Sequence, residues 1–237
     1  MAVTDDAVVK IRELIMSGKL QPGDRLPQES ALADSLGISR NSMREAVRTL
    51  TQARVLDVRH GSGTYVTSLE PSVLLEGISV AIEMVRDDTL AEVIEIRQLL
   101  EPAATALATQ RMTPESLEKI RAAHRRMENE FENVEELVRL DLEFHAAIVE
   151  AAGNATLSSI LEGLSSRTVR VRIWSGIMSD NSVQLTIDYH EQILRAIESG
   201  DPILAHAAAL MHVTHARRWL DAALAKRPKT KPSIRQN

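Results

Sequence analysis

The stretch LPQESALADSLGISRNSMREAVRTLTQARVLDVRHGSGTYV, residues 26–66, carries two helical patterns followed by two short runs of strand-forming residues. The first helical pattern, at 29–36, ends at Gly37, a residue type that favours a tight turn. Ser39 is a good cap for the second helix, which is predicted to run to about Gln52. Together these residues predict a helix–turn–helix.

The residues after the second helix predict a β-hairpin. The runs 55–59 and 64–67 are rich in Val, Leu, Thr and Tyr, and the turn Gly61-Ser62-Gly63 separates them. A helix–turn–helix followed by a hairpin is the element order of a winged helix-turn-helix. The segment therefore points first to DNA binding.

The second helix of this segment is predicted to be amphipathic. Arg40, Arg44 and Arg48 are spaced four residues apart and form one stripe along the helix. The residues expected to face the core are Met43, Ala46, Val47 and Leu50. Arginine at the start of such a helix is well suited to the edges of guanine in the major groove. Taken alone, the stripe would also fit an ordinary solvated basic face.

The charge distribution supports the DNA reading better than the net charge does. The whole chain carries a formal charge of −5, which does not suggest a nucleic-acid binder. Within 39–60, however, there are five arginines and only two acidic residues. Positive charge is therefore concentrated where phosphate attraction would act.

Length and composition limit the number of domains and the kinds of site that the chain can form. The chain has 237 residues, enough for one large or two ordinary domains, and only 3% are aromatic. It has no cysteine, which excludes disulfides, thiolate zinc sites and a cysteine nucleophile. We find no secretory leader and no apolar run of about 18 residues. We therefore expect a cytoplasmic, nucleoid-associated protein with no membrane partner.

The remaining sequence predicts a mainly α protein, in which the winged helix-turn-helix precedes an all-α helical bundle. The predicted parts are a DNA-binding domain at 1–68, a linker at 69–74, a helical domain at 75–226 and a disordered tail at 227–237. The predicted helices of the second domain are 73–85, 90–110, 114–130, 134–152, 155–178, 182–199 and 202–226.

The first domain resembles the DNA-binding domain of the GntR family of bacterial transcription regulators. The resemblance rests on PGDRLPQESALADSLGISRNSMREAVRTL and on the wing HGSGTYV. It implies DNA contacts from the start of the second helix and from the wing, to which we add Arg48 from the stripe: Ser39, Arg40, Asn41, Arg44, Arg48, His60 and Gly61. Many relatives carry an arginine where this chain has Ser30, so one charge-assisted contact is missing.

Histidines and one aspartate suggest a second site. Asp141 and His145 stand four residues apart and share a helix face, while His190 and His212 fall inside later helices. Converging imidazoles and a carboxylate would bind a divalent transition metal. From spacing alone, each histidine is better explained as a surface residue or a structurally hydrogen-bonded one than as a metal ligand. We expect His124, which lies in a highly charged stretch, to be exposed.

The helical part, about 90–224, resembles the FCD ligand-binding domain of FadR-type GntR regulators. That resemblance implies a metal held by Asp141, His145, His190 and His212, with His212 preferred over His215. Zinc is the first expectation, and nickel, manganese or iron would also suit these ligands. The resemblance also implies an effector pocket, for which the candidates are Arg97, Arg167, Arg170, Arg172 and Asn154.

These observations lead to one main hypothesis and two alternatives. The main hypothesis is a metabolite-responsive transcription regulator, a repressor, that binds a near-palindromic operator as a homodimer and senses a small organic acid. The first alternative is a metal-dependent enzyme that uses the Asp and three-His site, although we see no nucleophile or general base to accompany it. The second is a regulator whose metal is purely structural.

Overall fold

The computed structural model of the protein describes residues 3–84, 89–128, 133–165 and 183–226. The chain divides into two compact units, Met1–Gly77 and Ile78–Asn237. Each unit has its own cluster of buried apolar side chains. The division falls just after the predicted linker at 69–74, and the predicted tail at 227–237 lies outside the described residues.

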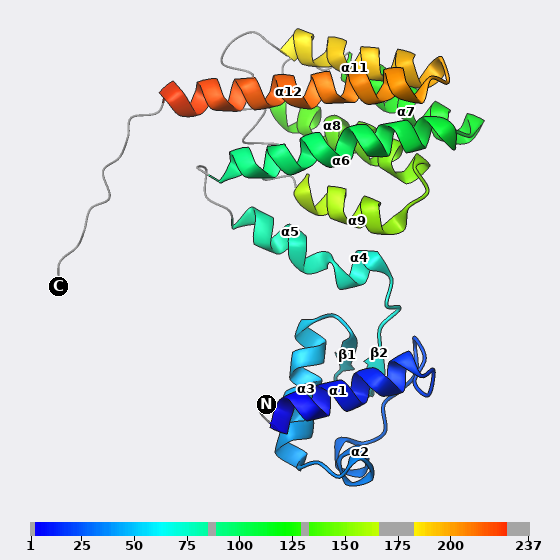
Figure 1. The fold of residues 1–237 in the computed structure, drawn as a ribbon, viewed down its shortest axis with the longest axis vertical. Coiled ribbons are helices and arrows are strands. Elements are labelled where there is room, and N and C mark those ends of the chain that lie inside the picture. Colours follow the sequence, from blue (N-terminus) through cyan, green and yellow to red (C-terminus); the bar gives the residue numbers. More distant parts are fainter. Residues whose placement is uncertain (1–2, 85–88, 129–132, 166–182, 227–237) are drawn as a thin grey trace, which may run out of the picture. The chain divides into compact units, whose positions relative to one another are not determined.

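The first unit is a winged helix-turn-helix, which confirms the predicted fold of this segment (Figure 1). Its elements are α1 (Val3–Met16), α2 (Glu29–Leu36), α3 (Arg40–Gln52), β1 (Leu56–Arg59), β2 (Gly63–Val66) and the short α4 (Pro71–Leu74). Its core is closed by side chains from the helices and both strands, among them Ile11, Leu32, Met43, Leu50, Leu56 and Val66.

Local chemistry explains the turn between α2 and α3. Gly37 has φ 67°, a left-handed conformation that costs glycine little, and its N–H donates to carbonyls at the end of α2. Ser39 caps α3, because its hydroxyl oxygen accepts a hydrogen bond of 3.1 Å from the Ser42 N–H. The turn and the cap therefore fix the direction in which α3 leaves α2.

The wing is an antiparallel hairpin in which Leu56 pairs with Val66 and Arg59 with Gly63. The chain before α2 joins it, since the Leu26 N–H donates to the Thr64 carbonyl at 2.8 Å. Gly61 at the tip has φ 73°, again in the left-handed region. The hairpin is thereby tied to the body of the unit rather than projecting alone.

The second unit is built from helices. They are α5 (Glu76–Glu83, which begins at the end of the first unit), α6 (Leu90–Gln110), α7 (Pro114–Met127), α8 (Val134–Ala151), α9 (Ala155–Leu164), α11 (Val183–Glu198) and α12 (Pro202–Lys226). The single helix predicted at 73–85 is instead broken at Leu75, next to Gly77, which has low helix propensity. Of the helix predicted at 155–178, residues 166–178 lie outside the described residues.

The helices of the second unit pack around α6 and α8. Helix α8 contacts α6, α7 and α9, while α12 lies along α6 and against α11 (Figure 1). The core is aliphatic apart from Phe144, which is fully buried. His124 is also buried, at 3% exposure, so the expectation that it is exposed was wrong: it lies on the inner face of α7 near the Phe144 ring.

None of the helices in the described ranges is both long and apolar enough to cross a bilayer.

Separate cores predict separate unfolding. Met43 is fully buried in the first unit, and Met43→Ala should destabilise that unit by about 2–5 kcal/mol through a lost transfer energy and a cavity. Calorimetry of the full chain should show one transition moving to lower temperature while the other stays. An equal shift of both transitions would contradict independent cores.

Candidate metal centre and DNA-binding surface

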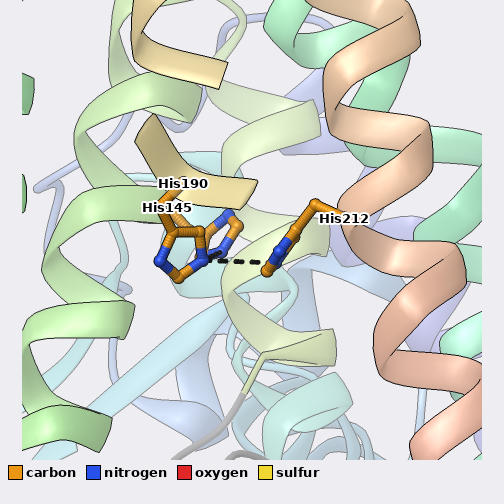
Figure 2. A group of neighbouring side chains, drawn as sticks. All are labelled: His145, His190 and His212. Atoms are coloured by element: carbon orange, nitrogen blue, oxygen red, sulfur yellow. Dashed lines mark hydrogen bonds between the residues drawn. The ribbon is translucent and has the colours of Figure 1, made fainter. Parts of the chain in front are cut away.

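Three histidines from three helices meet inside the second unit. His145 lies on α8, His190 on α11 and His212 on α12, and Figure 2 shows their rings converging. The Nε2 atom of His190 lies 3.3 Å from the Nε2 atoms of both His145 and His212. His190 and His212 are buried, and the His145 side chain is 11% exposed. The cluster could therefore hold a metal ion.

The spacing of these nitrogen atoms fits coordination better than mutual hydrogen bonding. A neutral imidazole has one N–H, so the Nε2 atom of His190 can donate to at most one of its two neighbours. Nitrogen ligands about 2.1 Å from a common ion at the tetrahedral angle lie about 3.4 Å apart. The observed separations of 3.3 Å are close to that value.

Asp141 completes a mixed nitrogen and oxygen donor set. It stands one helical turn before His145 and is buried, with its Oδ1 atom 3.5 Å from His190 Nε2 and 3.7 Å from His145 Nε2. A carboxylate is a suitable counter-charge for a divalent cation in an apolar interior. The structure thus brings together all four residues that the resemblance implied.

Glu101 and Arg97 on α6 form a layer behind His145. Glu101 Oε2 lies 3.8 Å from His145 Nδ1, and Glu101 Oε1 accepts a 2.5 Å hydrogen bond from Arg97 Nε. A carboxylate in this position orients a ligating imidazole. Arg97 is completely buried, and its two terminal nitrogens have no hydrogen-bond partner within the described part of the chain. Such donors call for an acceptor, either a ligand oxygen or ordered water.

His215 belongs to a different group of rings. Its Nε2 atom accepts a 2.6 Å hydrogen bond from the Trp219 indole N–H, and its ring lies 4.8 Å from that of Tyr189. Burial lowers the pKa of His215, with the charge of Arg218 as a second cause. A neutral ring suits its role as an acceptor. His212, three residues earlier, is the one that joins the cluster.

A cavity of about 300 Å³ opens beside His145, between α8 and α9. The described residues that line it are Glu101, Leu142, His145, Ala146, Val149, Leu161, Glu162 and Ser165. The resemblance implied an effector pocket in this unit, but not its position between α8 and α9 or its apolar wall, because side chains from three helices must be placed in space before they enclose a volume.

The predicted effector residues have different surroundings. Arg97 is not among the described residues that line the cavity, but its Nε atom donates a hydrogen bond to Glu101, which is one of them. Asn154 is exposed and caps α9, where its Oδ1 atom accepts a 3.1 Å hydrogen bond from the Leu157 N–H. Arg167, Arg170 and Arg172 lie outside the described residues. Direct effector contacts from all of these residues stay predictions.

The predicted DNA-contacting side chains are all on the surface of the first unit. The exposed residues are Ser39, Arg40, Asn41, Arg44 and Arg48 at α3, and His60 and Gly61 in the wing. The apolar stripe Met43, Ala46, Val47 and Leu50 faces inward, as predicted. Arg40 and Arg44 also line a concave surface of about 760 Å³ that includes Ser30 and the wing residues Gly63 and Thr64.

Arg25 is a cationic residue of this surface that the sequence reading missed. It lines the same concavity and packs so closely on Gly63 that a Cβ atom there would lie 2.7 Å from its Nε atom. Arg25 precedes α2 and belongs to no helical stripe. The only sequence signal was the resemblance around PGDRLP, which carried no role for it.

Two histidines on one helix provide a matched test of the metal centre. His212→Ala should remove a metal ligand. It should weaken zinc binding by at least about 10–100-fold, which is the loss typical of mutations in residues that only support a ligand. His215→Ala, three residues away, should leave zinc affinity unchanged. Both affinities can be measured by competition with a chromogenic chelator. Equal losses in the two variants would show that general disruption of α12 is responsible.

Comparison with known proteins agrees with both units. Residues 4–66 match the model of bacterial regulatory proteins of the gntR family, and residues 92–215 match that of the FCD domain. The HTH-type transcriptional regulator LutR of Bacillus subtilis is 32% identical, with 85% of this chain and 94% of LutR covered. The galactonate operon transcriptional repressor of Escherichia coli is 28% identical, with 92% and 96% covered.

A solved structure, Streptococcus agalactiae GntR, superimposes with a TM-score of 0.67 at 28% identity and covers 91% of this chain and 99% of its own. Its likeness extends over both the winged and the helical parts, as the family matches do. The chain therefore belongs to the GntR family of bacterial transcription regulators and carries a C-terminal FCD domain.

Proposed function

We propose that this transcriptional regulator is a repressor whose helical unit binds a divalent metal and a small carboxylate effector. The observation that carries the proposal is the buried cluster of three histidines and one aspartate, which adjoins a cavity. It lies in a chain whose other unit is a winged helix-turn-helix. The relatives named above are transcription regulators, which supports a sensing rather than a catalytic use of the site.

Asp141, His145, His190 and His212 would hold the ion, with zinc as the first candidate. When bound, a divalent ion supplies a Lewis-acid centre to which a carboxylate oxygen can coordinate. Glu101 would keep the His145 ring in its coordinating orientation, and the terminal nitrogens of Arg97 would be available to a ligand oxygen.

The first unit would read an operator through α3 and the wing. The N-terminal residues of α3 would enter the major groove, where Arg40 and Arg44 suit guanine edges. His60 and Gly61 at the wing tip would approach the sugar-phosphate backbone. A near-palindromic operator would match two such units in a homodimer.

Apolar side chains on the outside of the second unit support the homodimer. Leu99 on α6 is 71% exposed, and Ile203 on α12 is 81% exposed, with Leu210 partly exposed on the same helix. Helices α6 and α12 lie side by side and are joined by a 3.1 Å hydrogen bond between Gln98 and Thr214. Exposed apolar side chains on two paired helices are typical of an association face.

Effector binding would change operator affinity only by preferring one of two arrangements of the DNA-binding units. We propose that the predicted linker 69–74, which lies just before the division between the units, transmits this preference. The effector and the operator would then influence each other's affinity by the same factor.

The DNA-binding role of α3 can be tested with one arginine. Arg40→Ala should weaken operator binding by about 1–3 kcal/mol, because a base-edge contact is lost. Arg195→Ala removes an exposed arginine of the second unit and should leave operator affinity unchanged. Gel shift on the DNA flanking its own gene would measure both. Equal operator affinity in Arg40→Ala and wild type would exclude this residue from DNA contact.

The sensing role can be tested at the metal. His190→Ala should lower metal content and abolish the effect of carboxylates on operator binding, while the metal-free protein still retards DNA. Metal analysis and gel shift on the same sample would measure this. If the variant lost metal and melted at a lower temperature but wild type showed no response to any carboxylate, the metal would be purely structural.

A further inference from the structure

We propose that the effector is a small monocarboxylic acid whose chain beyond C2 is aliphatic and carries no hydroxyl groups, and not a polyhydroxylated sugar acid. This inference rests on the proposed function and specifies the chemistry of its ligand. It comes from the distribution of polar and apolar side chains around the cavity between α8 and α9.

The polar lining of the cavity is concentrated at its inner end. Glu101, His145 and Ser165 are buried or nearly so, and His145 joins this end to the candidate metal centre. Glu162 is exposed and marks the outer rim. Among the described lining residues, the buried groups able to contact a carboxylate, the Ser165 hydroxyl and the His145 ring, therefore lie at this inner end, on the side of the candidate metal centre.

As far as the described residues line it, the wall between the inner end and the rim is aliphatic. It consists of Leu142, Ala146 and Val149 on α8 and Leu161 on α9. Val149 and Leu161 are at most 6% exposed and belong to the main apolar core, so this part of the wall is fixed by packing. A ligand whose head group lies at His145 must lay its chain along these side chains.

Such a wall discriminates between ligands by the hydroxyl groups on their carbon chains. A methylene buried against it gains about fourfold in affinity. A ligand hydroxyl in the same place gives up its hydrogen bonds to water and finds no new hydrogen-bond partner on these side chains. Each such hydroxyl therefore lowers the affinity roughly tenfold. The volume of about 300 Å³ is at the lower end for ligand pockets, which favours a short chain.

Matched acids of equal carbon number would test this preference on zinc-loaded full-length protein. 2-Hydroxyhexanoate and gluconate share the same head group and six carbons, but gluconate carries hydroxyls along its chain. 2-Hydroxybutanoate and 2,3,4-trihydroxybutanoate form a shorter pair. Calorimetry should show 2-hydroxyhexanoate binding at least about 100-fold more tightly than gluconate, with a smaller difference for the shorter pair.

The outcomes separate this inference from the proposed function. Equal or tighter binding of gluconate, together with a gluconate effect on operator affinity, would overturn the aliphatic preference and leave carboxylate sensing intact. Binding of neither series to zinc-loaded protein would overturn carboxylate sensing itself, and this inference with it.

A cavity variant would show that the aliphatic wall is responsible. Leu142→Ala should weaken binding of 2-hydroxyhexanoate by about tenfold and leave 2-hydroxypropanoate within about twofold, since only the longer chain reaches the wall. Leu204→Ala on α12, which lies outside the lining, should change neither affinity. Equal weakening of both acids in Leu142→Ala would contradict a contact with the chain.

Discussion

Two imidazole nitrogens, those of His145 and His212, each 3.3 Å from the Nε2 atom of His190 in an apolar interior, are the constraint on which the helical unit depends. Buried polar atoms need partners, and these rings cannot all satisfy one another with the single N–H that each carries. A divalent cation shared with Asp141 would resolve the conflict and would cross-link α8, α11 and α12. Glu101 and the cavity beside it are placed around that centre.

This arrangement gives the ion two roles that are physically linked. By joining three helices it would stabilise one packing of the unit, and by facing the cavity through His145 it would present a binding point to an acid. A ligand bound at that point would contact helices that form the core. Its binding energy could then favour one packing of these helices over another. The arginines proposed to contact DNA lie on a separate unit that has its own apolar core.

Local signals in the sequence predicted much of the fold. Gly37 and Ser39 determine the turn into α3, and the predicted bounds of α2 and α6 agree with those observed. The i,i+4 spacing of Asp141 and His145 placed them on one face, but only the resemblance could add His190 and His212, because helices far apart in the chain must meet. The cavity wall, the buried His124 and the position of Arg25 depend on packing, which periodicity does not contain.

Anomalous diffraction from crystals of the protein, purified without chelator, would test the metal centre most directly. Data collected on both sides of the zinc, nickel, iron and manganese absorption edges should show one strong peak. Its centre should lie about 2.0–2.2 Å from the Nε2 atoms of the three histidines and from an Asp141 oxygen. Density for water or direct hydrogen bonds between the rings, with no anomalous peak at any edge and none after soaking with metal, would contradict the account.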